Sequence, residues 1–212
     1  MKKTVIATAL LAVSASPVFA AAENYSIDTP GMHASVNFKI NHLGYSWIVG
    51  RFNDFSGNFV FDEDNAANNS VDITVKTASI DTNHGERDRH IRSDDFLDVS
   101  KFPEATFKST SVTKDDDEGE YVVKGDLTLH GVTKPVEFEI EQVGAGDDPW
   151  GGFRRGFEGE MEVKLADFGI DYDLGPAAAT VYLEVHLVLF VQLPQRANQL
   201  LLQHLLERYL PA

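Results

Sequence analysis

The chain has 212 residues, a size that suits one large β domain or two small ones. Acidic residues number 33 against 18 lysines and arginines, and the net charge of −15 argues against nucleic acid and against electrostatic attachment to anionic membranes. Apolar residues make up 43% and include 14 phenylalanines, enough for a folded core. The absence of cysteine excludes disulfides, thiolate metal sites and cysteine nucleophiles.

The N-terminus predicts export. Lys2 and Lys3 precede an apolar run over residues 5–13, and small residues then lead to an alanine triplet at 20–22. This layout is typical of a secretory signal peptide, and the apolar run is too short to span a bilayer. We therefore expect residues 1–22 to be a signal peptide cleaved after Ala20 or Ala22, and the mature protein to be periplasmic.

From Tyr25 to His186 the dominant hydropathy period is two. Apolar and polar residues alternate over 36–40, 55–61, 71–75, 136–141, 160–165 and 181–185, so each segment is predicted to be a strand with one dry and one wet face. Turn residues separate these segments, among them the acidic run 115–120, which we interpret as a solvated hairpin tip, and the glycine-rich run 144–149. Short strands at close intervals predict an antiparallel barrel or sandwich.

Residues 82–98 break this pattern. The segment is densely charged, with Ile91, Phe96 and Leu97 as its main apolar residues, and we predict a short helix or ordered loop across one end of the β structure. Its charges suit either a surface salt-bridge network or a polar collar around a cavity mouth, and the sequence leaves both readings open.

Catalytic signatures are missing. No GxSxG, Walker, HExxH or GxGxxG motif occurs, and Asp167-Phe168-Gly169 matches a kinase motif by letters alone. The seven histidines are scattered, which favours hydrogen bonding over metal ligation. The sequence therefore predicts no catalytic residue, no metal site and no cofactor.

Seven short segments, in order along the chain, resemble the YceI-like family of exported, lipocalin-like, polyisoprenoid-binding proteins. They are NHLGYSW at 41–47, DTNHGERD at 81–88, KFPEATF at 101–107, GDLTL at 125–129, GVTKPV at 131–136, GDDPWGG at 146–152 and DFGI at 167–170. The resemblance implies an all-β fold, an extended antiparallel lipocalin-like barrel of about eight strands. It also implies an elongated apolar cavity that binds or carries a polyisoprenoid, quinone-like or prenyl-phosphate-like, without catalysis.

Parity and the resemblance together give a predicted site. Inward parity selects Val75 and Val163 among others, and the predicted lipid-binding residues are Phe38, Ile40, Leu43, Trp47, Phe59, Phe96, Phe102, Leu129, Phe138 and Leu165. The predicted headgroup residues are His84, Arg87, Arg92, Trp150 and Arg154.

Two rival functions stay open. One is an enzyme acting on an isoprenoid or quinone headgroup, with His84, Arg87 and His90 at the mouth; the other is a stress-related protein whose core is filled. The expected partner is a polyisoprenoid lipid, with no nucleic acid and no stable membrane insertion, and a homodimer is compatible with the sequence.

The C-terminal residues depart from the family pattern. We place the barrel at 23–187 and treat 188–212 as an atypical extension, in which only Arg196, Glu207 and Arg208 are charged. Pro194 and the spacing of Leu202, Leu205, Leu206 and Tyr209 predict a helix from about residue 195 to 209.

Overall fold

Antiparallel strands dominate the computed structural model of the protein, which describes residues 22–29, 33–149 and 151–191. The strands are β1 (Glu23–Ile27), β2 (Ser35–His42), β3 (Ser46–Phe52), β4 (Phe55–Phe61), β5 (Ser70–Lys76), β6 (Ile80–Asp81), β7 (Glu104–Lys114), β8 (Glu120–Leu129), β9 (Val132–Asp147), β10 (Phe153–Lys164) and β11 (Thr180–Val191). The helices are α1 (Gly85–Ile91) and four 3-10 turns, η1 (Ala66–Asn68), η2 (Thr77–Ser79), η3 (Leu165–Phe168) and η4 (Pro176–Ala178).

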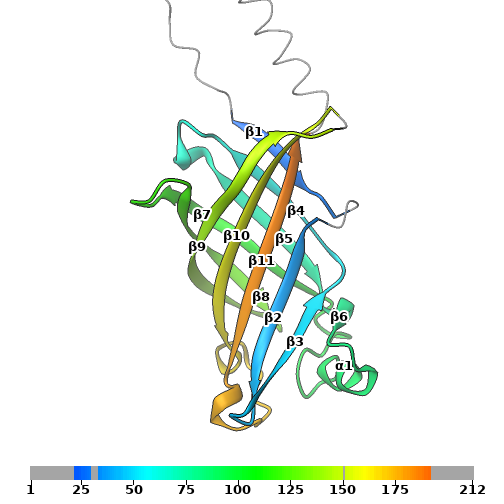
Figure 1. The fold of residues 1–212 in the computed structure, drawn as a ribbon. Coiled ribbons are helices and arrows are strands. Elements are labelled where there is room, and N and C mark those ends of the chain that lie inside the picture. Colours follow the sequence, from blue (N-terminus) through cyan, green and yellow to red (C-terminus); the bar gives the residue numbers. More distant parts are fainter. Residues whose placement is uncertain (1–21, 30–32, 150, 192–212) are drawn as a thin grey trace, which may run out of the picture.

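Eight strands close into a barrel in the order β1-β4-β5-β7-β8-β9-β10-β11, with β11 pairing back onto β1 (Figure 1). β11 is long enough to serve two partners on one edge, since residues 189–191 pair with β1 and residues 181–186 pair with β2. β3 and β6 extend the sheet beyond β2. The predicted all-β antiparallel barrel is confirmed.

Tight turns with left-handed residues connect the hairpins that matter below. His130 and Gly131 have φ of 51° and 75° between β8 and β9, the two positive values that a type I′ turn requires. Leu43 and Gly44 have φ of 56° and 83° between β2 and β3, and the Gly44 amide donates to Oδ1 of Asn41 at 2.7 Å. Both turns therefore hold their hairpins in one register.

The predicted break at 82–98 contains α1, as expected, and this segment covers one end of the barrel (Figure 1). The His84 side chain caps the helix by accepting from the Arg87 amide at 3.2 Å. Asp88 is buried and accepts from the amide of Thr82 at 2.9 Å, so the helix is fixed to the chain just after β6. Among the described residues, no helix has the length and apolarity needed to cross a membrane.

The C-terminal strand extends beyond the predicted barrel boundary at residue 187. β11 continues to Val191, and the buried Leu189 pairs with Arg155 of β10 and Ile27 of β1. Residues 188–191 therefore belong to the barrel, because they keep the same alternation of inward and outward side chains. The predicted helix near 195–209 and residues 1–21 of the predicted signal peptide lie outside the described residues.

The glycine-rich run before residue 148 also differs from expectation. Residues 144–147 remain in β9 and pair with β10, with a register shift at Gly156 and Phe157. Glycine on both strands lets the two backbones stay paired through this irregularity.

Candidate functional site: an apolar cavity at one end of the barrel

One half of the barrel encloses a cavity of about 360 Å³. Its wall comes from every strand between β2 and β11 except β4, and from α1 and the residues around it. The aliphatic and aromatic residues of the wall are Val36, Phe38, Ile40, Ile48, Phe52, Ile73, Val75, Ile80, Ile91, Phe96, Leu97, Ala105, Phe107, Leu127, Leu129, Phe138, Met161, Val163, Leu165, Ile170, Leu174, Val181, Leu183 and Val185. We call this half the cavity end.

Many of these side chains face inward and yet are only partly buried. Ile40, Ile48, Val75 and Leu183 are examples, each on the inward side of its strand. Because the barrel is closed around them, much of the surface that they expose faces the cavity. A well-packed core leaves few voids larger than a water molecule. The interior of this half is therefore hollow, unlike a packed core.

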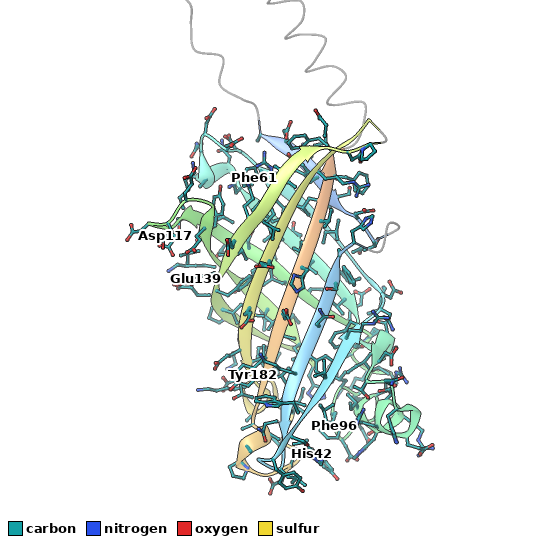
Figure 2. All side chains as sticks on the ribbon, viewed as in Figure 1. His42, Phe61, Phe96, Asp117, Glu139 and Tyr182 are labelled. Carbon is teal, nitrogen blue, oxygen red and sulfur yellow. The ribbon has the colours of Figure 1, made fainter. Side chains whose placement is uncertain are left out.

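The opposite half, which we call the packed end, is filled. Phe59 stacks on Phe157 with ring centroids 5.2 Å apart, and Phe61 and Tyr121 pack against the same cluster. Figure 2 shows Phe61 at this end and both His42 and Phe96 at the cavity end. The barrel interior is thus divided into a solid part and a hollow part.

A buried arginine completes the packed end. The Arg155 guanidinium lies 4.3 Å from the Phe61 ring centroid and donates to Oε1 of Gln142 at 2.8 Å. Burial raises the pKa of the Tyr25 hydroxyl to about 12, and its hydrogen bond to Glu23 adds to the rise while Arg155 opposes it.

Six of the ten predicted lipid-binding residues lie together in the cavity wall. They are Phe38, Ile40, Phe96, Leu129, Phe138 and Leu165. Gly50 explains how Phe38 fits, since a side-chain carbon at Gly50 would lie 2.7 Å from Cε1 of Phe38 and 2.8 Å from Cγ2 of Thr82.

The other four do not line the cavity. Leu43 lies in the turn between β2 and β3, and Trp47 lies on the outer face against Tyr182, with ring centroids 5.7 Å apart. Phe59 belongs to the packed end. Phe102 packs against His130 at the β8–β9 turn, with ring centroids 4.6 Å apart.

Polar groups enter the cavity wall at few points, namely His42, Arg87, His90 and Thr106. Arg87 donates from Nε to Oγ1 of Thr82 at 2.7 Å and from Nη2 to the Thr82 carbonyl at 2.6 Å. These two bonds fix the plane of the guanidinium group, and both are made by Nε and Nη2 and not by Nη1. The His90 Nε2 lies 2.9 Å from Oδ2 of Asp95, and the His90 ring is edge-on to the Phe96 ring.

The remaining predicted headgroup residues have other surroundings. His84 caps α1, and Arg92 donates to the carbonyls of Ala78 and Ile80. Arg154 pairs with Asp28 and with Asp148, whose Oδ2 is 2.9 Å from Nε of Arg154. Trp150 lies outside the described residues. Of the four predicted headgroup residues that the structure describes, Arg87 is the one that lines the cavity.

Sequence reasoning missed part of the wall. Ile48 and Phe52 of β3, Met161 of β10 and Leu183 of β11 all line the cavity. On β10 and β11, the alternation of apolar and polar residues could have identified Met161 and Leu183 as inward-facing. On β3 it could not, because apolar residues lie on both faces of that strand. Within the described residues, no cluster of three or more histidines and carboxylates has the arrangement of a metal site.

The protein is a closed antiparallel β-barrel, and one end of the barrel contains an apolar cavity large enough for a small-molecule ligand. The model of the YceI-like domain matches residues 25–193, and the chain belongs to this family. It is 53% identical over 192 residues to protein YceI of Escherichia coli O157:H7, an overlap of 91% of this chain and 97% of that protein.

Solved structures share the barrel. The YceI protein of Campylobacter jejuni matches with a TM-score of 0.65 and 28% identity, over 73% of this chain and 91% of that one. A polyisoprenoid binding domain from Saccharophagus degradans, implicated in plant cell wall breakdown, matches with a TM-score of 0.56 and 16% identity, over 79% and 98% of the two chains. The second likeness establishes the fold alone.

Proposed function

We propose that this protein binds or carries a polyisoprenoid lipid in the periplasm and does no covalent chemistry on it. The observation that carries the proposal is the cavity wall, in which aliphatic and aromatic side chains from most of the barrel surround a hollow with polar groups at few points. The binding named for the Saccharophagus degradans domain, which has the same fold, supports the same ligand class.

The physics suits a branched hydrocarbon chain. Burying apolar carbon is worth about 0.8 kcal/mol per methylene-sized unit, without any directed bond. A volume of about 360 Å³ lies within the range of roughly 300–1,000 Å³ that small-molecule pockets occupy. Because the stacked rings of Phe59 and Phe157 fill the packed end, a chain longer than the cavity must extend through the mouth or displace those rings.

The polar groups of the wall favour a headgroup that accepts hydrogen bonds. Arg87 is a permanent cation in the wall, His42 and His90 are the histidines of the wall, and none of its residues is a carboxylate. A phosphate or a quinone carbonyl would accept from the Arg87 guanidinium. A ligand that carries a cationic head has no counter-ion in this wall.

Mass spectrometry of lipid extracted from protein purified from periplasm tests the proposal. We expect an isoprenoid of unchanged mass, bound to protein that lacks its first 20 to 22 residues. Full-length protein confined to the cytoplasm would refute the location. Turnover of added isoprenoid would favour an enzyme, and protein without lipid that also fails to bind added prenol would favour the stress-related alternative.

A further inference from the structure

The hairpin of β2 and β3 is unlike the rest of the surface. Residues 40–50 contain no Asp, Glu, Lys or Arg, although such residues make up 24% of the chain. Four large apolar residues on this hairpin are exposed, which we call the tip patch: Leu43 (52%), Tyr45 (78%), Trp47 (52%) and Val49 (64%). Large apolar side chains left exposed together on one uncharged hairpin are a feature of interaction sites.

The tip patch is continuous with the cavity wall. Ile40, His42 and Ile48 of the same two strands face inward and line the cavity, while Trp47 and Val49 face outward. Tyr172, also exposed, packs on Phe96 of the wall with ring centroids 4.7 Å apart. The large exposed apolar side chains of the described residues therefore gather at the cavity end, with Val143 as the exception.

We propose that the tip patch docks the cavity end on the surface of a lipid bilayer, so that the ligand passes between membrane and cavity without crossing water. This inference rests on the proposed function. A prenyl chain that crossed water would expose apolar carbon along its whole length, which is unfavourable, and a mouth held at the bilayer avoids that exposure. The proposed contact is peripheral.

The chemistry of the patch suits a bilayer interface. Tryptophan and tyrosine concentrate at membrane–water interfaces, where an apolar ring and a polar edge meet. Trp47 lies edge-on to Tyr182, and the Lys39 Nζ lies 5.8 Å from the Tyr182 ring centroid, so a long basic side chain borders this aromatic pair. Since the chain carries a net charge of −15, apolar contact and not electrostatic attraction must hold it, and neutral lipid is sufficient.

A second copy of the chain is the competing occupant. Within the described part of the chain, β3 pairs with β6 only at Arg51 and Phe52, which leaves residues 46–50 there as a strand edge open to pairing. The most exposed residue of the patch, Tyr45, lies in the turn beyond this edge, where a pairing strand would leave it uncovered. A protruding turn fixed by the Asn41 side chain fits insertion between headgroups better than a flat interface.

Flotation with phosphatidylcholine vesicles tests the docking surface. The double variant Leu43→Ser, Tyr45→Ser removes the turn residues, and Val143→Ser is the matched control because Val143 is 66% exposed away from the cavity end. The protein is purified from cells and its N-terminus is defined by intact mass. We expect wild type and Val143→Ser to float, and the double variant to partition roughly tenfold or more weakly.

Further measurements separate the outcomes. Solanesol, a long-chain prenol, is offered either in detergent or in vesicles, and we expect the double variant to bind it normally from detergent and slowly from vesicles. Equal flotation of all proteins, or no flotation of wild type, overturns docking. Sedimentation that shows a wild-type dimer lost in the double variant, without vesicle binding, assigns the patch to self-association and also overturns docking. Wild type that floats but binds no solanesol from detergent instead overturns the proposed function.

Discussion

Filling the cavity is the sharpest perturbation of the proposed function. Ala105 of β7 lines the cavity, pairs with Val75 of β5, and lies two residues from Phe107 on the same inward face. Ala105→Phe adds about six carbon atoms to the hollow, which at about 0.8 kcal/mol per methylene-sized unit displaces up to about 5 kcal/mol of ligand contact. Because a flexible chain can shift within the cavity, we expect a loss of about 1–3 kcal/mol, or roughly 5- to 150-fold in affinity.

The stability of the unliganded protein gives an independent readout. Adding carbon to a well-packed core typically destabilises a protein by about 1–3 kcal/mol. In a true hollow the new ring gains contacts with neighbouring side chains instead, so the free energy of unfolding should stay unchanged or rise. Val143→Phe, which adds a ring to the outer face, is the control for size and apolarity.

Titration with solanesol in detergent, followed by urea unfolding of the same proteins, provides both measurements. The expected result is weaker binding by Ala105→Phe with undiminished stability, and wild-type binding by Val143→Phe. A destabilised Ala105→Phe that binds as tightly as wild type would refute the cavity as the ligand site, since the ring would then occupy packed core.

Three more predictions concern single positions. Gly50→Ala should destabilise the protein in urea unfolding, because the new carbon meets the Phe38 ring and Thr82; unchanged stability would refute that close approach. Arg87→Gln should weaken a prenyl phosphate several-fold more than a prenol of the same length, with about 1 kcal/mol of stability lost through its bonds to Thr82; equal losses for both ligands would exclude a headgroup role. The Tyr25 pKa is raised from 10.0 to about 12, so the stability that the protonated hydroxyl contributes is complete below pH 10 and is lost as the pH rises towards 12. The urea midpoint of Tyr25→Phe should therefore fall less steeply than that of wild type between pH 10 and pH 12. An equal fall of the midpoint in both proteins would contradict this prediction.

Hydropathy alternation predicted part of the cavity wall. Phe38, Ile40, Leu129 and Phe138 were selected by parity alone, because a closed sheet gives each strand one interior face. Phe59 has the same parity and lies in packed core. Parity specifies a face and not a height along the barrel, and the partner of Phe59 across the interior, Phe157, is 98 residues away in the chain.

The outward position of Trp47 shows a different limit. β3 reads Ser46-Trp47-Ile48-Val49-Gly50, with apolar residues at consecutive positions, so its two faces are not distinguished by alternation. Pairing with β2 decides the face, since Phe38 lies opposite Gly50 and Ile40 opposite Ile48.

Arginine roles depended still more on tertiary contacts. Arg87 and Arg92 are five residues apart in one charged segment, yet Arg87 lines the cavity and Arg92 donates to two backbone carbonyls. Arg154 pairs with Asp28, a residue 126 positions away. Charge density left a surface salt-bridge network and a polar collar at a cavity mouth both open, and the packing of α1 against β6 selects which guanidinium reaches the interior.

The same alternation of apolar and polar residues lines a cavity in one half of the barrel and forms a packed core in the other. At the measured dependence of about 24 cal/mol per Å³, an empty volume of about 360 Å³ corresponds to an upper bound of about 9 kcal/mol of forgone packing. That is comparable with the whole net stability of an ordinary domain, about 5–15 kcal/mol. The packed end contributes to stability through the Phe59, Phe61 and Phe157 rings and the buried Arg155. The proposed ligand would restore the contacts that the hollow lacks, and its binding should in turn stabilise the barrel.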